Sequence, residues 1–242
     1  MHLSIVIPAW NEEKRLPPSL EKIYKFLQSK NFDSEIIIIN DGSRDKTDEV
    51  VREFTKKHNS SKVKIVGLGY KPNRGKGYAT KVGMLAAKGD YMYLCDSDLS
   101  TPIEELDNFL KYKEEYDIVI GSRALAQSNV KTSLLRKFLG RFGNFLINAI
   151  LIKDLKDTQA GFKLFNRKCK ILFEKQRIER WGFDFEILYL AERLKFRVKE
   201  LPVEWEHKED SRVKPLDYFK TLSELIKIRL TKYDLNGNST KN

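Results

Sequence analysis

The sequence predicts an α/β fold, a mainly parallel sheet with helices on both faces. Short apolar runs alternate along the chain with amphipathic helical patterns, which is the arrangement of successive strand–helix–strand units. Each apolar run is nearly continuous, as expected for strands that are buried on both faces. The chain has 242 residues, of which 41% are hydrophobic and 33% charged, so it is long enough for one domain with a full core.

The first half of the chain predicts five strands with helices between them. The strands are expected at 3–8, 35–40, 63–68, 91–95 and 117–121. The helices are expected at 17–28, 46–57 and 76–88. In such a sheet, ligands bind beyond the carboxyl ends of the strands. Polar residues follow each of these ends, which makes this edge the expected site.

The second half predicts further elements of both kinds. A strand is expected at 158–165, with Gln159 and Lys163 facing the site, then a helix at 183–194 and a late strand at 197–205. Amphipathic helices are expected at about 131–152 and 217–230, each apolar on one side and basic on the other. Such helices fit a membrane interface, and they also fit packing on the core or on a partner subunit. Residues 1–232 are expected to form one domain and 233–242 a disordered tail.

Charge and cysteine content restrict the partners and the compartment. The net charge of +11 favours phosphate-bearing partners or an anionic membrane surface. The two cysteines, Cys95 and Cys169, form no metal or redox motif, which fits a reducing compartment. The sequence shows no signal peptide and no apolar run of about 18 residues that could span a bilayer. Membrane contact is therefore expected to be peripheral, on the cytoplasmic face.

The fourth predicted strand ends in two carboxylates. Asp96 and Asp98 are one residue apart, so in an extended chain they leave the same face. Two like charges this close repel each other, and a cation relieves the repulsion. Hard oxygen ligands suit Mg²⁺ or Mn²⁺. The same pair alone also fits a turn with solvated aspartates, and the polar clusters after the other strands favour the metal site.

A basic, glycine-rich stretch follows the third strand. Residues 73–77 read NRGKG, and glycines beside Arg74 and Lys76 at a helix start can hold a phosphate through backbone N–H groups and charge. A solvated loop is the alternative for this stretch, and a simple turn is the alternative for Asp41 and Gly42. Together with the carboxylates, these residues predict a cleft for a nucleotide diphosphate.

Several stretches in order resemble family 2 glycosyltransferases. They are PAWNEEKRL (8–16), NDGSRDKT (40–47), NRGKGYA (73–79), DSD (96–98), DTQAGFKLF (157–165) and RWGFDFEILYLAE (180–192). The last two narrow the resemblance to dolichyl-phosphate β-glucosyltransferases, with dolichyl-phosphate mannose synthases as close relatives. The resemblance runs from about residue 3 to residue 230. It implies a Rossmann-like, A-type glycosyltransferase catalytic domain over residues 1–232.

The resemblance assigns the nucleotide-sugar pocket to residues after the first, second and fourth strands. Pro8, Trp10, Glu12 and Asp41 would line the uridine pocket. Asp96 would lie near the ribose and phosphate, with Arg74 and Lys76 as phosphate clamps.

The resemblance also assigns the metal and the donor sugar. Asp98 would hold the metal together with Asp96, and Ser100 occupies the place of a glutamine that helps with the metal in mannose synthases. Asp184 and Glu186 would bind sugar hydroxyls or supply a base. By position alone, these two acids also fit simple dipole partners of a helix N-terminus.

The acceptor phosphate is expected to meet basic residues of the second half. Arg123, with Arg136 or Lys137, is expected to hold it. In the relatives, a serine followed by a basic residue closes on the phosphates, and Ser211 and Arg212 match them. The segment 207–214 also fits a plain solvated loop.

The expected reaction is a metal-dependent, inverting transfer of glucose from UDP-glucose to dolichyl (polyprenyl) phosphate. The alternatives are a GDP-mannose-dependent dolichyl-phosphate mannose synthase and transfer to another polyprenyl phosphate. A different class is a non-catalytic basic module that binds membrane or nucleic acid. The aspartates at the sheet edge would repel a polyanion, so no nucleic-acid partner is expected.

Overall fold

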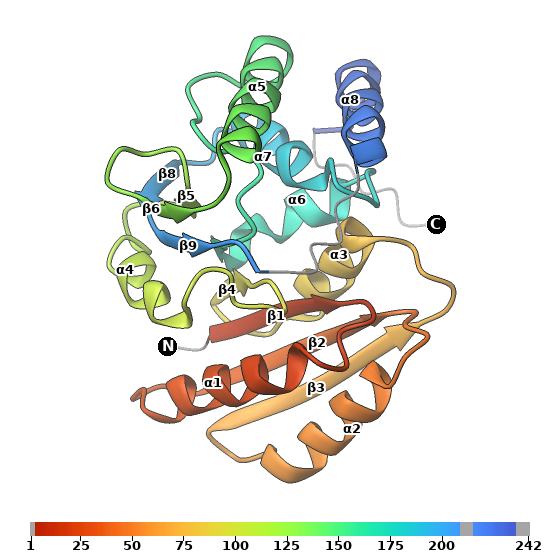
Figure 1. Cartoon of the computed structure of the whole chain (residues 1–242). Helices are drawn as coiled ribbons and strands as arrows, with labels where there is room; N and C mark the ends of the chain where they lie inside the picture. Colours follow the sequence, from red (N-terminus) through yellow and green to blue (C-terminus); the bar gives the residue numbers. More distant parts are fainter. Residues whose placement is uncertain (1–2, 209–214, 236–242) are drawn as a thin grey trace.

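The computed structural model describes residues 3–208 and 215–235, with side chains for all of these except 134–139 and 215–219. The first half alternates strands and helices as predicted, with ends within about two residues of the expected ones (Figure 1). In chain order these elements are β1 (Leu3–Ala9), α1 (Leu16–Gln28), β2 (Ser34–Asp41), α2 (Thr47–His58), β3 (Val63–Tyr70), α3 (Lys76–Ala86) and β4 (Tyr91–Leu94).

The second half has shorter strands and more helices. Its elements are the 3₁₀ helix η1 (Ile103–Glu105), α4 (Leu106–Leu110), β5 (Ile118–Ser122), β6 (Asn129–Lys131), α5 (Leu134–Ile150), β7 (Lys163–Asn166), the 3₁₀ helix η2 (Arg167–Cys169), α6 (Lys170–Lys175), α7 (Phe183–Arg193), β8 (Val198–Pro202), β9 (Glu204–Glu206) and α8 (Pro215–Leu230).

A seven-stranded sheet in the order β3-β2-β1-β4-β7-β5-β8 forms the centre of the molecule. Its neighbouring strands are parallel except at β7, which runs antiparallel between β4 and β5. The predicted α/β fold with a mainly parallel sheet is confirmed. Because β7 is reversed, its first residue, Lys163, pairs with Leu94 and Ile120 near the carboxyl ends of β4 and β5.

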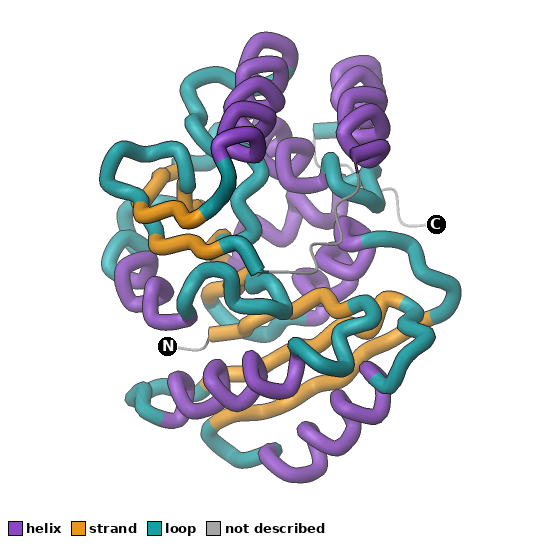
Figure 2. Tube along the Cα trace, viewed as in Figure 1, coloured by secondary structure: helices purple, strands orange, loops and turns teal. Residues whose placement is uncertain are grey.

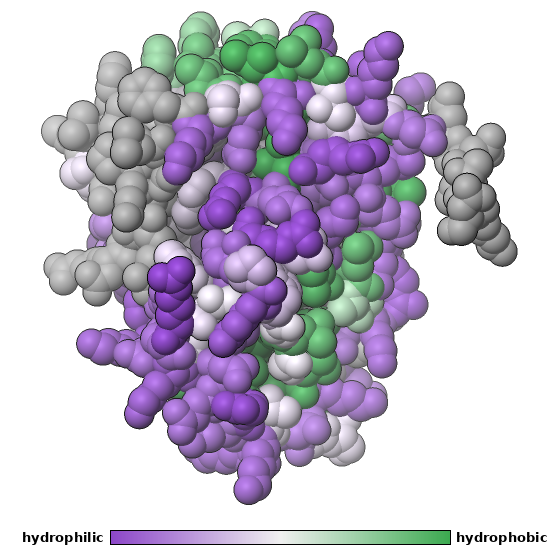
Figure 3. Space-filling view, turned by 90° about the vertical axis from the view of Figure 1, so that its right-hand side faces the viewer, coloured by the Kyte–Doolittle hydropathy of each residue, from purple (hydrophilic) through white to green (hydrophobic). Residues whose placement is uncertain are grey.

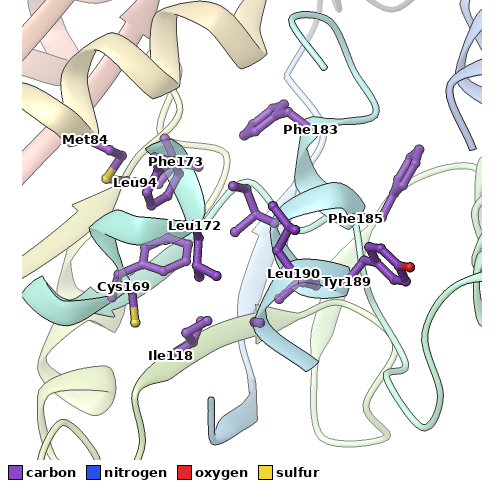
Figure 4. Packing of buried hydrophobic residues seen from close by; sticks show 14 of the residues in the cluster. Met84, Leu94, Ile118, Cys169, Leu172, Phe173, Phe183, Phe185, Tyr189 and Leu190 are labelled. Atoms are coloured by element: carbon purple, nitrogen blue, oxygen red, sulfur yellow. The ribbon is translucent and has the colours of Figure 1, made fainter. Parts of the chain in front are cut away.

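Alternate residues of the central strands enter two separate hydrophobic clusters. Ile5 and Ile7 of β1 pack with Leu20 of α1. Val6, on the opposite face, shares a cluster with Met84 of α3 and Phe183 of α7, part of which is shown in Figure 4. Helices α1 and α2 therefore cover one face of the sheet and α3, α6 and α7 the other (Figure 2). Burial on both faces explains the nearly continuous apolar strands.

Two predicted strands differ from the observed ones. The strand expected at 158–165 begins only at Lys163, because the start of the preceding segment bonds to α5. The backbone N–H and hydroxyl of Thr158 donate to Asn144 Oδ1 at 3.0 and 2.8 Å. The strand expected at 197–205 is divided at Val203, and its second part, β9, leaves the main sheet to pair with β6.

The packed part of the chain reaches beyond residue 232, where the tail was expected to begin. Tyr233 and Leu235 pack against the core, and the Tyr233 hydroxyl donates to Glu186 at 2.7 Å. A buried carboxylate offers this phenol a strong acceptor, which explains why the chain stays on the surface of the domain here. None of the helices in the described part of the chain has the length and apolarity that crossing a bilayer requires.

Candidate active site

The carboxyl end of β4 carries the paired carboxylates. Asp96 accepts a hydrogen bond from Lys76 Nζ at 2.5 Å. Asp98 Oδ1 accepts from the backbone N–H and the hydroxyl of Ser100 at 3.0 and 2.9 Å, and Arg15 Nη1 lies 3.8 Å from Asp98 Oδ2. The two carboxylate side chains remain 26% and 23% exposed, so both can meet a ligand from solvent.

The carboxylate oxygens of Asp96 and Asp98 suit a hard divalent cation. In the described ranges, no group of three or more His, Cys, Asp or Glu side chains could hold a metal. Two exposed carboxylates leave several coordination positions for substrate phosphates, which is the usual way in which Mg²⁺ is bound. Ser100 was expected to help with the metal, but its hydroxyl donates to Asp98 and orients that carboxylate. The side chains present therefore fit an ion whose coordination is completed by a diphosphate.

Asp41 holds the loop that leads into α3. Its carboxylate, which is buried, accepts from Asn73 Nδ2 at 2.6 Å and from the backbone N–H groups of Arg74 and Gly75 at 2.8 and 2.9 Å. Gly75 has φ +110°, a conformation that favours glycine. The carboxylate that was expected to line a uridine pocket is therefore already bonded to this loop, and it fixes the loop's shape.

Arg74 leaves the loop toward the protein surface. Its guanidinium lies 3.4 Å from the centre of the Tyr78 ring and pairs with Glu179. Asn73, beside it, accepts from Arg180 Nη1 at 3.2 Å. The structure thus holds Arg74, an expected phosphate clamp, in an exposed stack and ion pair away from Asp96.

Lys76 is the cation of this loop that reaches the paired carboxylates. Burial disfavours the charged ammonium, but the negative charges of Asp96, Asp184 and Asp98 outweigh burial and raise the pKa of Lys76. One lysine is therefore bonded to Asp96 and feels the negative charge of Asp98, also after β4, and of Asp184 in α7. Lys76 stays charged at neutral pH, where it can neutralise phosphate oxygens.

Arg123, directly after β5, is fixed by Asp157. The Asp157 carboxylate accepts from Arg123 Nε at 2.7 Å, from Nη2 at 2.9 Å and from the Arg123 backbone N–H at 2.9 Å. Burial disfavours the charged guanidinium, but Asp157 outweighs it and raises the pKa of Arg123. The Trp205 ring centre lies 5.5 Å from the guanidinium, and Glu200 Oε1 accepts from the Asp157 backbone N–H at 2.9 Å. Arg123 is thus a rigid cation at the same sheet edge.

The start of β7 brings a buried lysine to Asp184. Lys163 Nζ donates to Asp184 Oδ1 and to the Ala160 carbonyl oxygen. The Lys163 and Asp184 side chains are 1% and 7% exposed. Gly161, two residues before Lys163, lies against Asp96, since an added Cβ would be 2.0 Å from Asp96 Oδ2. The sequence predicts Lys163 to face the site; in the structure its ammonium is buried and bonded to Asp184 and Ala160.

Glu186 does not join this cluster, although it was paired with Asp184 in the sequence analysis. It is fully buried, and its carboxylate accepts from the backbone N–H groups of Arg177 and Ile178, both at 2.8 Å. Burial raises the pKa of Glu186 in spite of these bonds and the one from Tyr233. The structure gives this carboxylate a role in anchoring the 177–178 segment to α7.

The residues expected for the uridine pocket follow β1. Pro8 is buried within the strand, and Trp10 is 38% exposed. The Glu12 carboxylate accepts from Arg15 at 2.5 and 2.7 Å, while its backbone N–H donates to Thr47 at 2.8 Å. All three lie at the carboxyl edge of the sheet, beside the end of β2.

Four residues expected to hold phosphates cannot be placed. Ser211 and Arg212 lie outside the described residues. Arg136 and Lys137 lie in the part of α5, residues 134–139, whose side chains are not described.

Asp157 and Glu200 are the members of the site region that the sequence analysis missed. Asp157 begins the DTQAGFKLF stretch, and an acid ahead of a strand would have indicated the site only if that strand had been known to run antiparallel. Glu200 lies within β8 and acts through the backbone N–H groups of Lys156 and Asp157, which no side-chain pattern reveals.

Comparisons with known proteins identify the family of the chain. Residues 4–171 match the family described as Glycosyl transferase family 2. A dolichyl-phosphate beta-glucosyltransferase of Trichomonas vaginalis is 40% identical over 95% of this chain and 73% of its own length. The protein of that name from Homo sapiens is 33% identical over 94% of this chain and 75% of its own length.

A solved structure shares the fold. Glucosyl-3-phosphoglycerate synthase from Mycobacterium tuberculosis, in complex with Mn²⁺, UDP and glucosyl-3-phosphoglycerate, matches with a TM-score of 0.65 at 18% identity. The match covers 94% of this chain and 79% of that one.

Proposed function

Because the chain belongs to glycosyltransferase family 2 and is a glycosyltransferase, we propose that it transfers glucose from UDP-glucose to dolichyl phosphate or a related polyprenyl phosphate. One observation carries this proposal. Exposed carboxylates (Asp96, Asp98), fixed cations (Lys76, Arg123) and a further acid (Asp184) occupy the same edge of the sheet. Relatives 33 to 40% identical carry the name dolichyl-phosphate beta-glucosyltransferase, which supports the choice of sugar and acceptor.

The donor half of the site is acidic and needs compensating charge. As the bond between glucose C1 and the β-phosphate oxygen breaks, UDP leaves with the electron pair and gains negative charge. Lys76 neutralises part of this charge where it develops. When bound at Asp96 and Asp98, Mg²⁺ or Mn²⁺ supplies further positive charge to the diphosphate. Asp184 accepts hydrogen bonds from hydroxyl groups of the glucose.

In the acceptor half of the site, the charge of the phosphate must be neutralised and its attacking oxygen oriented, and a general base matters less. A phosphate monoester has a second pKa of about 6, so it is mostly dianionic at neutral pH. Its oxygen attacks C1 from the face opposite the leaving UDP, and the new bond has the inverted, β configuration. Arg123, held by Asp157, binds the attacking phosphate, with Arg136, Lys137, Ser211 and Arg212 as further cationic or closing groups.

An exposed apolar surface suits the lipid tail of such an acceptor. Phe142, Phe145 and Ile150 of α5 are 53%, 65% and 37% exposed, and Leu222, Ile226 and Leu230 of α8 are 41%, 52% and 76% exposed. Figure 3 shows apolar atoms gathered at the end of the molecule where α5 and α8 lie in Figure 1. Arg141, Lys220, Lys227 and Arg229 on the same helices are basic. This α5–α8 face contacts an anionic membrane surface, on the cytoplasmic side, which the free, buried Cys95 and Cys169 fit.

The test is a donor panel with a short polyprenyl phosphate. Purified protein with Mn²⁺ or Mg²⁺ is incubated with UDP-glucose, GDP-mannose or UDP-N-acetylglucosamine. The mass of the lipid product and its rate of formation are measured by mass spectrometry. A hexosyl product at least about 100-fold faster from UDP-glucose is expected, because a site that hydrogen-bonds particular hydroxyls discriminates strongly. Product from GDP-mannose alone, or no lipid product from any donor, contradicts the proposal.

A further inference from the structure

A single turn touches acids from two different elements of the site. The turn 158–163 leads into β7, and its Gly161 packs against the Asp96 carboxylate at the end of β4. Its last residue, Lys163, bonds to Asp184 at the start of α7. The same ammonium donates to the Ala160 carbonyl within the turn. The turn is therefore in contact with one carboxylate on each side.

Lys163 is unusual in being a fully buried cation. Its side chain is 1% exposed and lies within the sheet between β4 and β5. Burying an ammonium is unfavourable unless a charged partner and further acceptors are well placed, and an apolar side chain of similar size is often more stabilising. Fold stability alone therefore does not explain a lysine at this position. Its two hydrogen bonds, to the Asp184 carboxylate and to the Ala160 carbonyl oxygen, indicate that the ammonium holds these two groups in place.

We propose that Lys163 is a positioning residue that holds Asp184 in register with Asp96, so that the hexose and the diphosphate of one donor molecule are bound together. This inference rests on the proposed function, since it requires a donor with both parts. Lys163 touches no substrate: it fixes the Asp184 carboxylate from behind, and the turn transmits the same alignment to Asp96 through Gly161. Errors of about 1 Å in such alignment can cost about 100-fold in rate.

Loss of a positioning lysine should have a different effect from loss of a lysine that does not contact the site. Lys170 offers a matched control, because its Nζ donates to the carbonyl oxygens of Leu85 and Ala87 at the end of α3 and contacts no carboxylate of the site. Lys163→Met and Lys170→Met each replace an ammonium-bearing side chain with an uncharged side chain of similar length. Only the first is expected to affect the donor sugar.

The experiment measures binding and turnover for the whole chain. Affinities for UDP and UDP-glucose are measured by calorimetry with Mn²⁺, and kcat and KM by product formation. Lys163→Met is expected to bind UDP within about twofold of wild type but UDP-glucose at least about tenfold more weakly, with kcat lowered about 100-fold. Lys170→Met is expected to match wild type in all three. The double variant Lys163→Met/Asp184→Asn is expected to be no slower than Asp184→Asn, because Lys163 acts through Asp184.

Three outcomes overturn the proposal: Lys163→Met within threefold of wild type in kcat and UDP-glucose affinity, equal losses of UDP and UDP-glucose binding, or losses that multiply in the double variant. Should Lys163→Met fail to fold, Lys163→Arg decides, since it keeps the charge but changes the geometry. A kcat lowered at least tenfold supports positioning, and a wild-type kcat overturns it. Failure of the proposed function is seen separately, in wild type that binds no UDP-glucose or uses another donor.

Discussion

Two buried carboxylates at the site region, Asp157 and Glu186, respond oppositely to burial because their partners differ. Burial acts to raise both pKa values, but Arg123 outweighs it at Asp157 and lowers that pKa. Glu186 receives only neutral donors, Tyr233 and two backbone N–H groups, and its pKa is raised. A charged partner thus decides the direction of the shift. Asp157 contributes stability above its ordinary pKa, whereas Glu186 contributes it at low pH.

Glu186→Gln should reveal the second effect. The pKa of Glu186 is raised in the folded chain above the ordinary 4.5, so its stabilisation is complete below that value and is lost as the pH rises through the folded pKa. The unfolding free energy of wild type, relative to Glu186→Gln, should therefore fall as the pH is raised above 4.5. Urea unfolding over a series of pH values measures it. A difference that is constant or rises with pH contradicts the prediction.

Asp98→Ala should abolish transfer without unfolding the chain. The side chain is 23% exposed, and its partners are the nearby Ser100 and one longer ion-pair contact with Arg15 at 3.8 Å, so stability should change by less than about 1 kcal/mol. Loss of charge stabilisation at the diphosphate should lower kcat by at least about 1,000-fold. Asp107→Asn, at an exposed acid paired with Lys30, is the control. Near-normal turnover of Asp98→Ala with UDP-glucose would refute the metal assignment.

The sequence predicts most acids of the candidate site, but it does not distinguish their separate roles. Asp184 and Glu186 are two residues apart in α7, and in a helix this turns their side chains about 200° from each other. One therefore faces Lys163 and the other the 177–178 segment. Before the helix's orientation on the sheet was known, nothing distinguished them.

At the scale of elements, the strands and helices of the first half follow the sequence closely, and β7 does not. An apolar run buried on both faces carries no sign of its direction, so the reversal of β7 was not predictable. That reversal is what places Asp157 and Lys163 with Asp96 at the site edge. The short strand β6 was missed, and β9 was expected only as the end of a longer strand, because each has only three residues, too few for a periodic pattern.

Phe145→Glu should weaken membrane binding through α5. Phe145 is 65% exposed on the α5–α8 face, so a charge there should leave the fold intact while it opposes burial in the lipid interface. Binding to vesicles containing anionic lipid should fall at least about tenfold, since burying a phenylalanine contributes about 1.5–3 kcal/mol. Leu85→Glu, at a leucine of α3 that is 37% exposed, is the control. Equal binding by both variants and wild type would exclude this face.

Truncation should show that residues 233–235 belong to the folded domain. A chain ended after Lys232 loses the Tyr233 bond to Glu186 and the packing of Leu235. It should be about 2–4 kcal/mol less stable, because a buried carboxylate loses its partner. A chain ended after Leu235 keeps both contacts and should match wild type in thermal unfolding. Equal stability of the two truncated chains would show that residues 233–235 contribute nothing.

At the scale of the whole molecule, the net charge of +11 is not explained by the fold. Among the described residues of the site, acids are at least as numerous as bases, so the positive excess must act elsewhere. Composition predicted a phosphate-bearing or anionic partner, and the apolar α5–α8 face adds where a lipid surface would meet the protein. The fold itself is indifferent to this excess, which affects association and solubility.

Vesicle binding should therefore depend on salt and lipid charge. Raising ionic strength from about 0.05 to 0.5 M shortens the screening length severalfold and should weaken binding to anionic vesicles at least about fivefold. Binding to neutral vesicles, which depends on the apolar face alone, should be weak and nearly independent of salt. Co-sedimentation measures both. Tight, salt-independent binding to neutral vesicles would show that the charge has no part in docking.

The insertion of β7 between two earlier strands also bears on how the chain is made. Chains emerge from the ribosome amino end first, and domains fold as their elements become available. β4 and β5 precede β7 in the chain, yet in the sheet they are joined only through it. The four strands β3, β2, β1 and β4 can assemble early. The candidate site is complete only after residues 157–184 have been translated. A nascent chain that stops short of this point would carry Asp96 and Asp98 with Lys76 and Arg15. It would lack the packing of Gly161 against Asp96 and the Lys163–Asp184 and Arg123–Asp157 pairs.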